Sequence, residues 1–538
     1  MANLDFSPAE PVSVKKNEGK PSQKPIDILW KHEFFLCVVS LIAAFLIQIG
    51  ALGFDTEMRL QVTHSLWTDA PAVVDASSVW PAYGTKGVNG TVQSWYGIGH
   101  SLLMLPADII ATGILSFTGF RGDMYDNLKN AAVGYLVFPL LSMLAILVSF
   151  KLLKLLGFSS NHATFGALGL LFCTTFMQYT QKNGENSMLL LFLLCGYYFI
   201  TRWLNEGSIK FLIAGAFFPG YNLLARLPNV CDLAVIFLYA AVILFSRLRA
   251  GTIDRKKAAR AFRELLISFG GVFIFFLFWD RYYQWSRFGS VFSTYLHIRG
   301  VEHRAMFPDL PSSYPFSTPF FTGFLGALFS PRRSIFLFDP LLAATIYLFA
   351  KLWRRIGIEI KALAASLLLL LLAMIVFYAT FFNWGGAHAW GDRFVVVPVE
   401  LLSMLGIALL ANNFRRFRLK GRVLTFFFLA LSLIIQIAST VFASNLEEWQ
   451  ANDLGYTFVV GLRFANMAAV LFGKAGEWGL NRIETWEDFS NPFYMPFRVS
   501  RLFPGIAANI LIGLWILGTV LLVVYLALFV FRAKRNAR

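Results

Sequence analysis

The chain carries the heptapeptide Gly53-Phe54-Asp55-Thr56-Glu57-Met58-Arg59 directly after its first long apolar run, which covers residues 34–52. A run of this length is enough for a helix to cross a hydrocarbon layer about 30 Å thick. Two carboxylates, Asp55 and Glu57, therefore emerge where the first predicted span ends, at a boundary between membrane and water. Acidic side chains at such a boundary are costly unless they are solvated, paired or used in function. These two acids either stay solvated there or belong to a functional site.

The composition predicts a membrane protein made of helices. Of the 538 residues, 57% are hydrophobic and only 14% are charged, and the mean hydropathy is +0.60. About a quarter of the residues of a soluble protein are charged, so we predict a polytopic membrane protein with an all-α fold. The net charge of +16 does not indicate nucleic acid, because the basic residues gather in short segments between apolar runs, as in cytoplasmic loops. The four cysteines form neither a disulfide framework nor a metal-ligand pattern.

Twelve apolar runs are long enough to serve as membrane-spanning helices. A thirteenth candidate, residues 97–117, contains His100, Pro106 and Asp108, which argues against a lipid-buried crossing. If this segment lies at the interface, both termini are cytoplasmic and the cytoplasmic segments hold 29 of the 47 Lys and Arg residues. We therefore predict an interfacial helix at 97–117 and about twelve spans, at residues 34–53, 131–153, 162–180, 186–203, 209–223, 230–246, 265–282, 335–352, 361–381, 394–411, 422–443 and 506–531.

The predicted spans divide the chain into four parts, and an inner (plasma) membrane location is expected. Because residues 1–32 contain no apolar core, the first span itself acts as the targeting signal. The parts are a polar cytoplasmic tail (1–32), a transmembrane module (33–443) with long outer loops at 54–130 and 283–333, a further outer segment (444–505), and a final span with a basic cytoplasmic tail (506–538).

Charged residues from four places are predicted to meet at the outer boundary. Carboxylates beside basic side chains suit a reaction in which a base activates an acceptor hydroxyl while cations hold a phosphate leaving group. The four places are the pair Asp55 and Glu57, the segment 182–186 with Lys182 and Glu185, the pair Arg332 and Arg333, and the turn 383–393 with Trp384, His388 and Arg393.

Each of these charges also has a structural interpretation. Glu185 would stabilise a helix N-terminus through the helix dipole, and Arg393 would snorkel to the membrane interface. Arg332 and Arg333 would contact lipid headgroups. Glu400 lies seven residues beyond Arg393, inside a predicted span and on nearly the same helix face. An acid at that depth usually has a partner, and Arg393 is the candidate.

The chain resembles the GT-C glycosyltransferases, polytopic enzymes that include protein O-mannosyltransferases and the aminoarabinose transferases of lipid A. Their first outer loop carries an acidic motif, and Asp55-Thr56-Glu57 matches its DxE form. Residues 95–100 (WYGIGH) resemble the tyrosine-and-proline stretch that opens the family's interfacial helix, with Gly97 and Ile98 in place of the prolines. Glu185 lies where these enzymes often carry a second acid, and residues 384–394 resemble a tryptophan-glycine and arginine-aromatic turn of bacterial members.

The resemblance implies that residues 33–443 form a GT-C-like catalytic module for inverting transfer. A sugar would pass from a polyprenyl-phosphate carrier to a lipid-linked glycan, lipid or protein acceptor on the outer face of the membrane, among membrane lipids. No cofactor is demanded by these residues, and a divalent metal stays open. The implied site consists of Asp55, Glu57 and Glu185 as catalytic residues, Arg393, Lys182, Arg226 and Arg332 at the donor phosphate, and Tyr96, His100, Trp384 and His388 at the substrates.

Two further expectations concern loops. The glycines of the turn 383–393 would let a phosphate approach the backbone, because they lack Cβ atoms. The loop 283–333 would close over the site and exclude water.

Two other classes of protein remain as alternatives. A major-facilitator transporter would show twelve spans split by a basic loop such as 247–263, although the long outer loops and the boundary position of the charges argue against it. A lipid-linked glycan ligase or polymerase would carry its catalytic residues in a late outer loop, here 444–504, where the basic residues are scattered.

Overall fold

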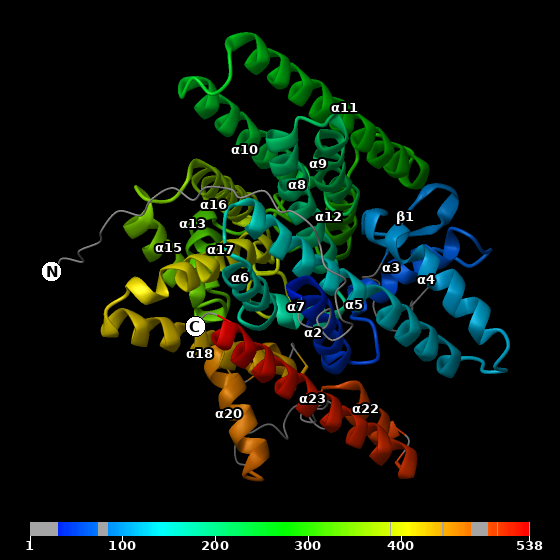
Figure 1. Ribbon diagram of the computed structural model, residues 1–538. Coiled ribbons are helices and arrows are strands. Elements are labelled where there is room, and N and C mark those ends of the chain that lie inside the picture. Colours follow the sequence, from blue (N-terminus) through cyan, green and yellow to red (C-terminus); the bar gives the residue numbers. More distant parts are fainter. Residues whose placement is uncertain are drawn as a thin grey trace.

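The computed structural model describes residues 31–73, 84–387, 389–443, 446–453, 455–474, 493–502 and 504–536. Most of these residues are helical, and the described strands are a single antiparallel hairpin of β1 (Gly84–Lys86) and β2 (Val92–Ser94). The predicted all-α fold is therefore confirmed (Figure 1). Nearly all of the predicted tail 1–32, much of the segment 444–505 and the candidate residue His388 lie outside the described residues.

Eight described helices are long and apolar enough to cross a membrane, and each matches a predicted span. The chain is thus a multi-pass membrane protein. The eight are α5 (Asp123–Leu155), α8 (Asn186–Glu206), α10 (Val230–Arg249), α11 (Arg255–Phe288), α16 (Ile358–Tyr378), α17 (Val396–Asn413), α18 (Leu419–Val441) and α23 (Ile506–Asn536). The other four predicted runs form the shorter helices α2 (His32–Ile47), α6 (Ser160–Phe172), α9 (Ile209–Tyr221) and α15 (Leu341–Leu352). Twelve crossings therefore stay a prediction.

Two runs that were predicted as continuous spans are broken. Residues 162–180 divide into α6 and α7 (Phe176–Lys182), and residues 335–352 divide into α14 (Ile335–Phe338) and α15. Pro340 explains the second break because it has no N–H to donate within a helix. The two breaks bond to each other, since the Asp339 carboxylate accepts from the Thr175 N–H at 2.8 Å and from its hydroxyl at 3.0 Å.

The first loop folds into α3 (Phe54–Ser65), the hairpin and α4 (Gly99–Leu115), which corresponds to the predicted interfacial helix. Polar residues of α4 face the protein, while Ile110 and Ile114 are exposed. Asp108 is fully buried and accepts hydrogen bonds from His64 Nδ1 at 2.9 Å and from Trp67 Nε1 at 2.7 Å. These bonds fix α4 to α3, so Asp108, one of the residues that argued against a lipid-buried crossing, serves packing between the two helices.

The helices pack around a central group. Buried α8 contacts α5, α9 and α17, while α11 and α23 lie at opposite edges with exposed apolar faces (Figure 1). At one edge, Phe35 of α2 stacks on Phe529 of α23 with ring centroids 3.6 Å apart. Shorter helices outside the predicted spans are α12 (Tyr295–Met306), α13 (Phe320–Phe329), α19 (Leu446–Asp453), α20 (Val459–Leu471) and α22 (Met495–Leu502).

Candidate active site

The acidic motif of the first loop lies against the segment that joins α7 to α8. Asp55 is in the first turn of α3, and Thr56 Oγ1 donates a hydrogen bond to the Asn183 carbonyl at 2.8 Å. Asn183 has a positive φ of 55°, which ends α7 and turns the chain toward Glu185. A Cβ atom on Gly53 would lie 3.0 Å from the Lys182 carbonyl oxygen, so glycine permits this close approach.

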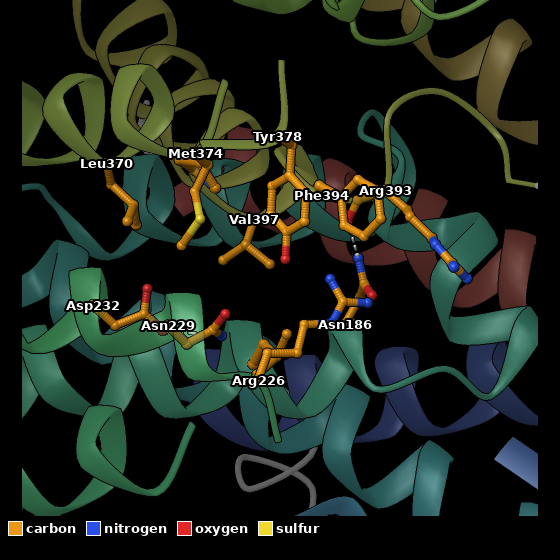
Figure 2. A pocket seen from close by; sticks show the side chains of 12 residues that line it. Asn186, Arg226, Asn229, Asp232, Leu370, Met374, Tyr378, Arg393, Phe394 and Val397 are labelled. Atoms are coloured by element: carbon orange, nitrogen blue, oxygen red, sulfur yellow. Dashed lines mark hydrogen bonds between the residues drawn. The ribbon is translucent and has the colours of Figure 1, made fainter. Parts of the chain in front are cut away.

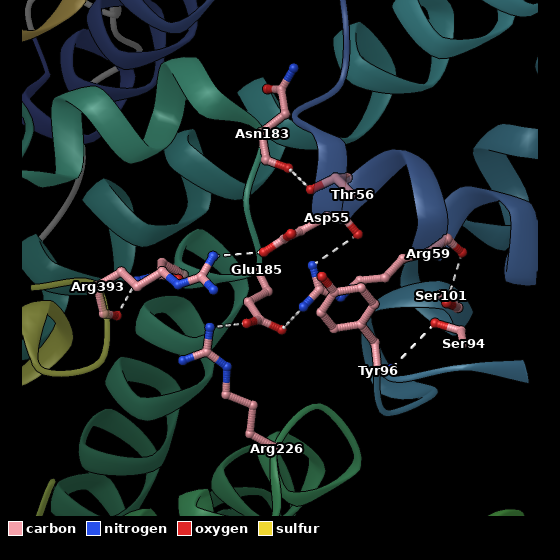
Figure 3. A network of polar contacts seen from close by, with 11 residues as sticks. Asp55, Thr56, Arg59, Ser94, Tyr96, Ser101, Asn183, Glu185, Arg226 and Arg393 are labelled. Atoms are coloured by element: carbon pink, nitrogen blue, oxygen red, sulfur yellow. Dashed lines mark hydrogen bonds and ion pairs between the residues drawn. The ribbon is translucent and has the colours of Figure 1, made fainter. Parts of the chain in front are cut away.

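Asp55 forms an ion pair with Arg393 from the turn before α17. Asp55 Oδ2 and Arg393 Nη1 are 2.6 Å apart (Figure 3), and the two side chains are 33% and 25% exposed. Burial raises the pKa of Asp55, but the Arg393 and Arg59 guanidiniums outweigh it and hold this pKa well below its usual range. The expected pairing of Arg393 with Glu400 is wrong, because Arg393 pairs with Asp55 and Glu400 Oε1 lies 3.0 Å from the Thr175 hydroxyl oxygen.

Glu185 is enclosed between two arginines. Its Oε2 lies 2.6 Å from Arg59 Nη2, its Oε1 pairs with Arg226, and both Glu185 and Arg59 are only 3% exposed (Figure 3). Removing one partner of such a buried pair leaves an uncompensated charge, which is strongly destabilising. The geometry therefore fits a carboxylate that holds Arg59 and Arg226 in place, rather than one that receives a proton from an acceptor.

Arg59 is a site residue to which the sequence analysis gave no role. Besides binding Glu185, it donates to the Asp55 carbonyl oxygen at 3.2 Å and lies over the Tyr96 ring, 3.9 Å from its centroid. The sequence does contain a pattern that would have identified Arg59. It follows Asp55 by four positions, and residues four apart on a helix share a face.

Tyr96 completes the surroundings of Asp55. It lies just after the hairpin, where its N–H donates to Ser94 Oγ at 3.2 Å, and its hydroxyl hydrogen-bonds to the Asp55 side chain. A Cβ atom at the next residue, Gly97, would lie 2.2 Å from the Leu224 carbonyl oxygen. Glycine at this position thus lets the stretch press against the loop before α10.

Positive charge is in excess around Asp55. Burial and the neighbouring Arg393 lower the pKa of Lys182 to about 8, so its ammonium group is the most easily discharged of the cations. Burial raises the pKa of Asp392, the neighbour of Arg393 in the turn, to about 7. The described site combines the cations Arg59, Lys182, Arg226 and Arg393 with the carboxylates Asp55 and Glu185.

Two predicted site residues lie close to Asp55 in sequence or space but face elsewhere. Glu57 accepts a hydrogen bond from Asn130 Nδ2 at 3.1 Å, away from Arg393. His100 is fully buried against the ring of Phe138, and neither of its ring nitrogens hydrogen-bonds to a described residue. It is enclosed within the protein rather than at an accessible surface.

Two others belong to packing contacts. The Trp384 ring packs on α13, where a Cβ atom on Gly326 would lie 2.5 Å from it. Arg332 donates to Asn452 Oδ1 of α19 at 2.6 Å and is 4.0 Å from Glu448. The structure brings neither side chain to Asp55.

The glycines of the turn 383–393 face arginine stems and a ring. A Cβ atom on Gly385 would lie 2.7 Å from Cγ of Arg333, and one on Gly386 would lie 2.3 Å from Cγ of Arg393. Gly386 also has a positive φ of 64°, as does Gly391, at 77° and against the ring of Phe338. These glycines therefore leave room for neighbouring side chains, and the approach of a phosphate to the backbone of this turn stays a prediction.

A pocket extends from the arginines between α8, α10, α16 and α17. Figure 2 shows Arg226, Arg393 and Asn186 toward one end of it, and Leu370 and Met374 facing Asp232 and Asn229 at the other. Asn186 Nδ2 donates to the Arg393 carbonyl oxygen at 3.0 Å, which fixes the polar end. Beyond the guanidinium groups, the α16 side of the pocket is apolar and the opposite side carries two polar side chains. The apolar side could hold the chain of an amphiphilic anion. In the described residues, no group of three or more His, Cys, Asp and Glu side chains is arranged to hold a metal ion.

Comparison with known proteins finds similarity among solved structures. No protein family and no curated protein matches this chain. One similar structure is the archaeal oligosaccharyltransferase AglB from Archaeoglobus fulgidus, in complex with an inhibitory peptide and a dolichol-phosphate. It is 16% identical to this chain, and the match covers 78% of this chain and 55% of the AglB chain with a TM-score of 0.43. This chain therefore spans about half the length of that protein.

A bacterial structure is similar over more of its length. ArnT from Cupriavidus metallidurans, bound to undecaprenyl phosphate, is 13% identical, and the match covers 85% of this chain and 73% of ArnT with a TM-score of 0.42. Both matches cover more than three quarters of this chain at identities of 16% or less. The likeness concerns the arrangement of helices, and the chemistry of the site rests on this chain's own side chains.

Proposed function

We propose that this protein is a membrane glycosyltransferase that moves a sugar from a polyprenyl-phosphate carrier to a cell-envelope acceptor, with inversion at the sugar. The observation that carries the proposal is the excess of cations around one accessible carboxylate, at one end of a pocket whose α16 side is apolar. Arg226 and Arg393 would bind the phosphate there, and the first units of the polyprenyl chain would lie along Leu370 and Met374.

The charge of the site suits the leaving group better than the donor. A sugar phosphodiester carries one negative charge, whereas the departing monophosphate carries about −1.5 to −2 near neutral pH. Cations fixed around this phosphate therefore stabilise the transition state more than the ground state, which is the condition for catalysis. Arginine suits this role because its planar fork binds phosphate oxygens in a bidentate way.

Asp55 would act as the general base once the donor is bound. A carboxylate held at low pKa by Arg393 is a weak base. A phosphate that takes hydrogen bonds from Arg393 weakens the Asp55 pair and raises the basicity of Asp55. The acceptor hydroxyl then gives its proton to Asp55 and its oxygen bonds to the sugar's anomeric carbon. The bond from that carbon to the phosphate oxygen breaks on the opposite face, and its electron pair leaves with the phosphate.

Mass spectrometry of cell-envelope glycans tests the proposal in the living cell. Cells that lack the gene should lose one sugar from one class of envelope molecule, and the wild-type gene should restore it. A copy with Asp55→Asn should not restore it although the protein accumulates to wild-type levels. Unchanged glycans in the deletion strain would reject the proposal.

One observation favours a transporter as the second candidate. The buried acids Asp339 and Glu400 lie at the interruption between α14 and α15 and within α17, and interrupted helices with acids line the substrate paths of many carriers. Reconstituted vesicles distinguish the two functions, because a carrier would move a solute across the bilayer without any donor lipid.

A further inference from the structure

The side chain of Arg333 packs inside the turn 383–393, which carries Arg393. Its side chain is only 8% exposed, and its Nη1 donates to the carbonyl oxygens of Ala389 and, at 3.3 Å, of Gly391. Its aliphatic stem occupies the space beside Gly385, where a Cβ atom would lie 2.7 Å away. One arginine thus binds the backbone on both sides of Trp390, two to four residues before Arg393.

The other end of Arg333 is held by α19. Its Nη2 lies 3.0 Å from Glu448 Oε2. The neighbouring residue Glu447 is fully enclosed and makes two 2.6 Å contacts with Arg463 of α20. Arg463 also donates to carbonyl oxygens at the end of α18 and lies 5.0 Å from the ring of Trp390. The helices α19 and α20 therefore reach the Arg393 turn through Glu448 and through Trp390.

We infer that Arg333 and Glu448 are positioning residues that hold the turn 383–393 so that Arg393 points at Asp55. The inference rests on the proposed function in one respect, namely that Arg393 binds the donor phosphate. It gives α19 and α20 a supporting role, which differs from the catalytic role that a glycan ligase would place in the segment 444–504. Arg463, the arginine of α20, is committed to Glu447 and to backbone carbonyls and is fully buried.

Arg332 provides a matched control. It adjoins Arg333 and lies near the same Glu448, at 4.0 Å, but its hydrogen bond goes to Asn452 and no described contact joins it to the turn. Arg333→Lys keeps the positive charge but loses the fork that bonds two carbonyl groups and a carboxylate together. Glu448→Gln keeps the size of the side chain and removes its charge.

The test uses the full chain in lipid nanodiscs, with amide hydrogen exchange of the turn and binding of farnesyl monophosphate as readouts. Arg333→Lys should speed exchange in residues 383–393 and weaken binding by about tenfold, as expected for losing a hydrogen bond from a charged group. Glu448→Gln should have a smaller effect in the same direction, and Arg332→Gln should leave the exchange of the turn as in the wild type. Exchange elsewhere should stay unchanged, which a general loss of stability would not produce.

Unchanged exchange of the turn in both Arg333→Lys and Glu448→Gln would overturn the inference. If Arg333→Lys does not fold, Glu448→Gln decides alone. A wild-type protein that fails to bind farnesyl monophosphate would count against the proposed function, while the exchange of the turn would still accept or reject the positioning role.

Discussion

Asp55 and Arg393 are bound to each other at 2.6 Å, and this contact limits what each can do alone. We expect Asp55→Asn to lower sugar transfer by about 10²–10⁴, the usual effect of losing a general base. The same change should tighten the binding of farnesyl monophosphate, because Arg393 loses the carboxylate that competes with phosphate. Titration calorimetry and a transfer assay on the purified variant measure the two effects.

Glu57→Gln is the control for Asp55→Asn. Glu57 accepts a hydrogen bond from Asn130 and does not contact Arg393. The Glu57→Gln change should therefore leave donor binding unchanged. Weaker binding of the monophosphate in Asp55→Asn would contradict the competition between carboxylate and phosphate.

The pKa of Lys182 predicts how donor binding depends on pH. With its pKa lowered to about 8, Lys182 is charged at pH 7 and loses its proton as the pH rises to 9. The phosphate keeps its charge over this range, because its second pKa is about 6. Farnesyl monophosphate should therefore bind more weakly at pH 9 than at pH 7, and Lys182→Gln should remove the step near pH 8. A step that persists in Lys182→Gln would assign it to another group.

The structure brings some of the predicted site residues together and separates others, for a geometric reason. Asp55, Glu185 and Arg393 were identified by their charge at predicted span ends, and the structure brings them together. Glu57 was paired with Asp55 as one motif, but α3 is helical there and two residues span about 200° of a helix with 3.6 residues per turn. The two acids therefore point to different sides, which the motif alone does not reveal.

At the scale of elements, Thr175 joins the two broken runs to α17. Its hydroxyl lies 3.0 Å from both Asp339 Oδ2 and Glu400 Oε1. The hydroxyl has one hydrogen to donate, so one of the two acids must carry a proton for both contacts to be hydrogen bonds. Glu400→Gln supplies that hydrogen permanently and should leave stability nearly unchanged.

Thr175→Val removes the hydroxyl and keeps the shape, leaving buried carboxyl oxygens without this partner. We expect it to lower the free energy of unfolding by about 1–3 kcal/mol. Thermal unfolding of both variants in the same detergent measures the difference. A Glu400→Gln protein that is less stable than Thr175→Val would contradict a shared proton.

Helices were predictable where an apolar run is uninterrupted. A break was not predictable where its polar residues leave the mean hydropathy of the run high. The eight long helices follow from apolar runs alone. The break at residues 173–175 escaped prediction because threonine barely lowers the mean hydropathy of its run, whereas Pro340 was a visible signal for the other break. The hairpin escaped because β1 and β2 have only three residues each.

At the scale of the whole molecule, the predicted topology puts Asp123 and Asp309 on the outer face and Lys256 inside. All three residues are exposed, so single cysteines there report on sidedness in a background without the four native cysteines. An impermeant maleimide applied to intact spheroplasts should label positions 123 and 309 and spare 256. Labelling of position 256 would show that 97–117 crosses the membrane and would reverse the later half of the topology.

Contacts between segments that lie far apart in the sequence were the hardest feature to predict. Arg393 pairs with Asp55 across 338 positions, and Glu185 joins Arg59 to Arg226. Topology predicted only that these residues share a boundary. Which of them touch depends on side-chain packing, such as the space that Gly386 leaves for the stem of Arg393.

The central claim is that Arg393 binds the phosphate of a lipid-linked donor, and binding of farnesyl monophosphate to Arg393 variants in nanodiscs tests it most directly. Arg393→Lys should keep the charge yet weaken binding, because lysine cannot form the bidentate contact. Arg393→Ala should weaken it further, by about tenfold or more, the usual range for a lost hydrogen bond from a charged group. An Arg393→Ala protein that binds farnesyl monophosphate as tightly as the wild type would contradict the assignment of the phosphate site.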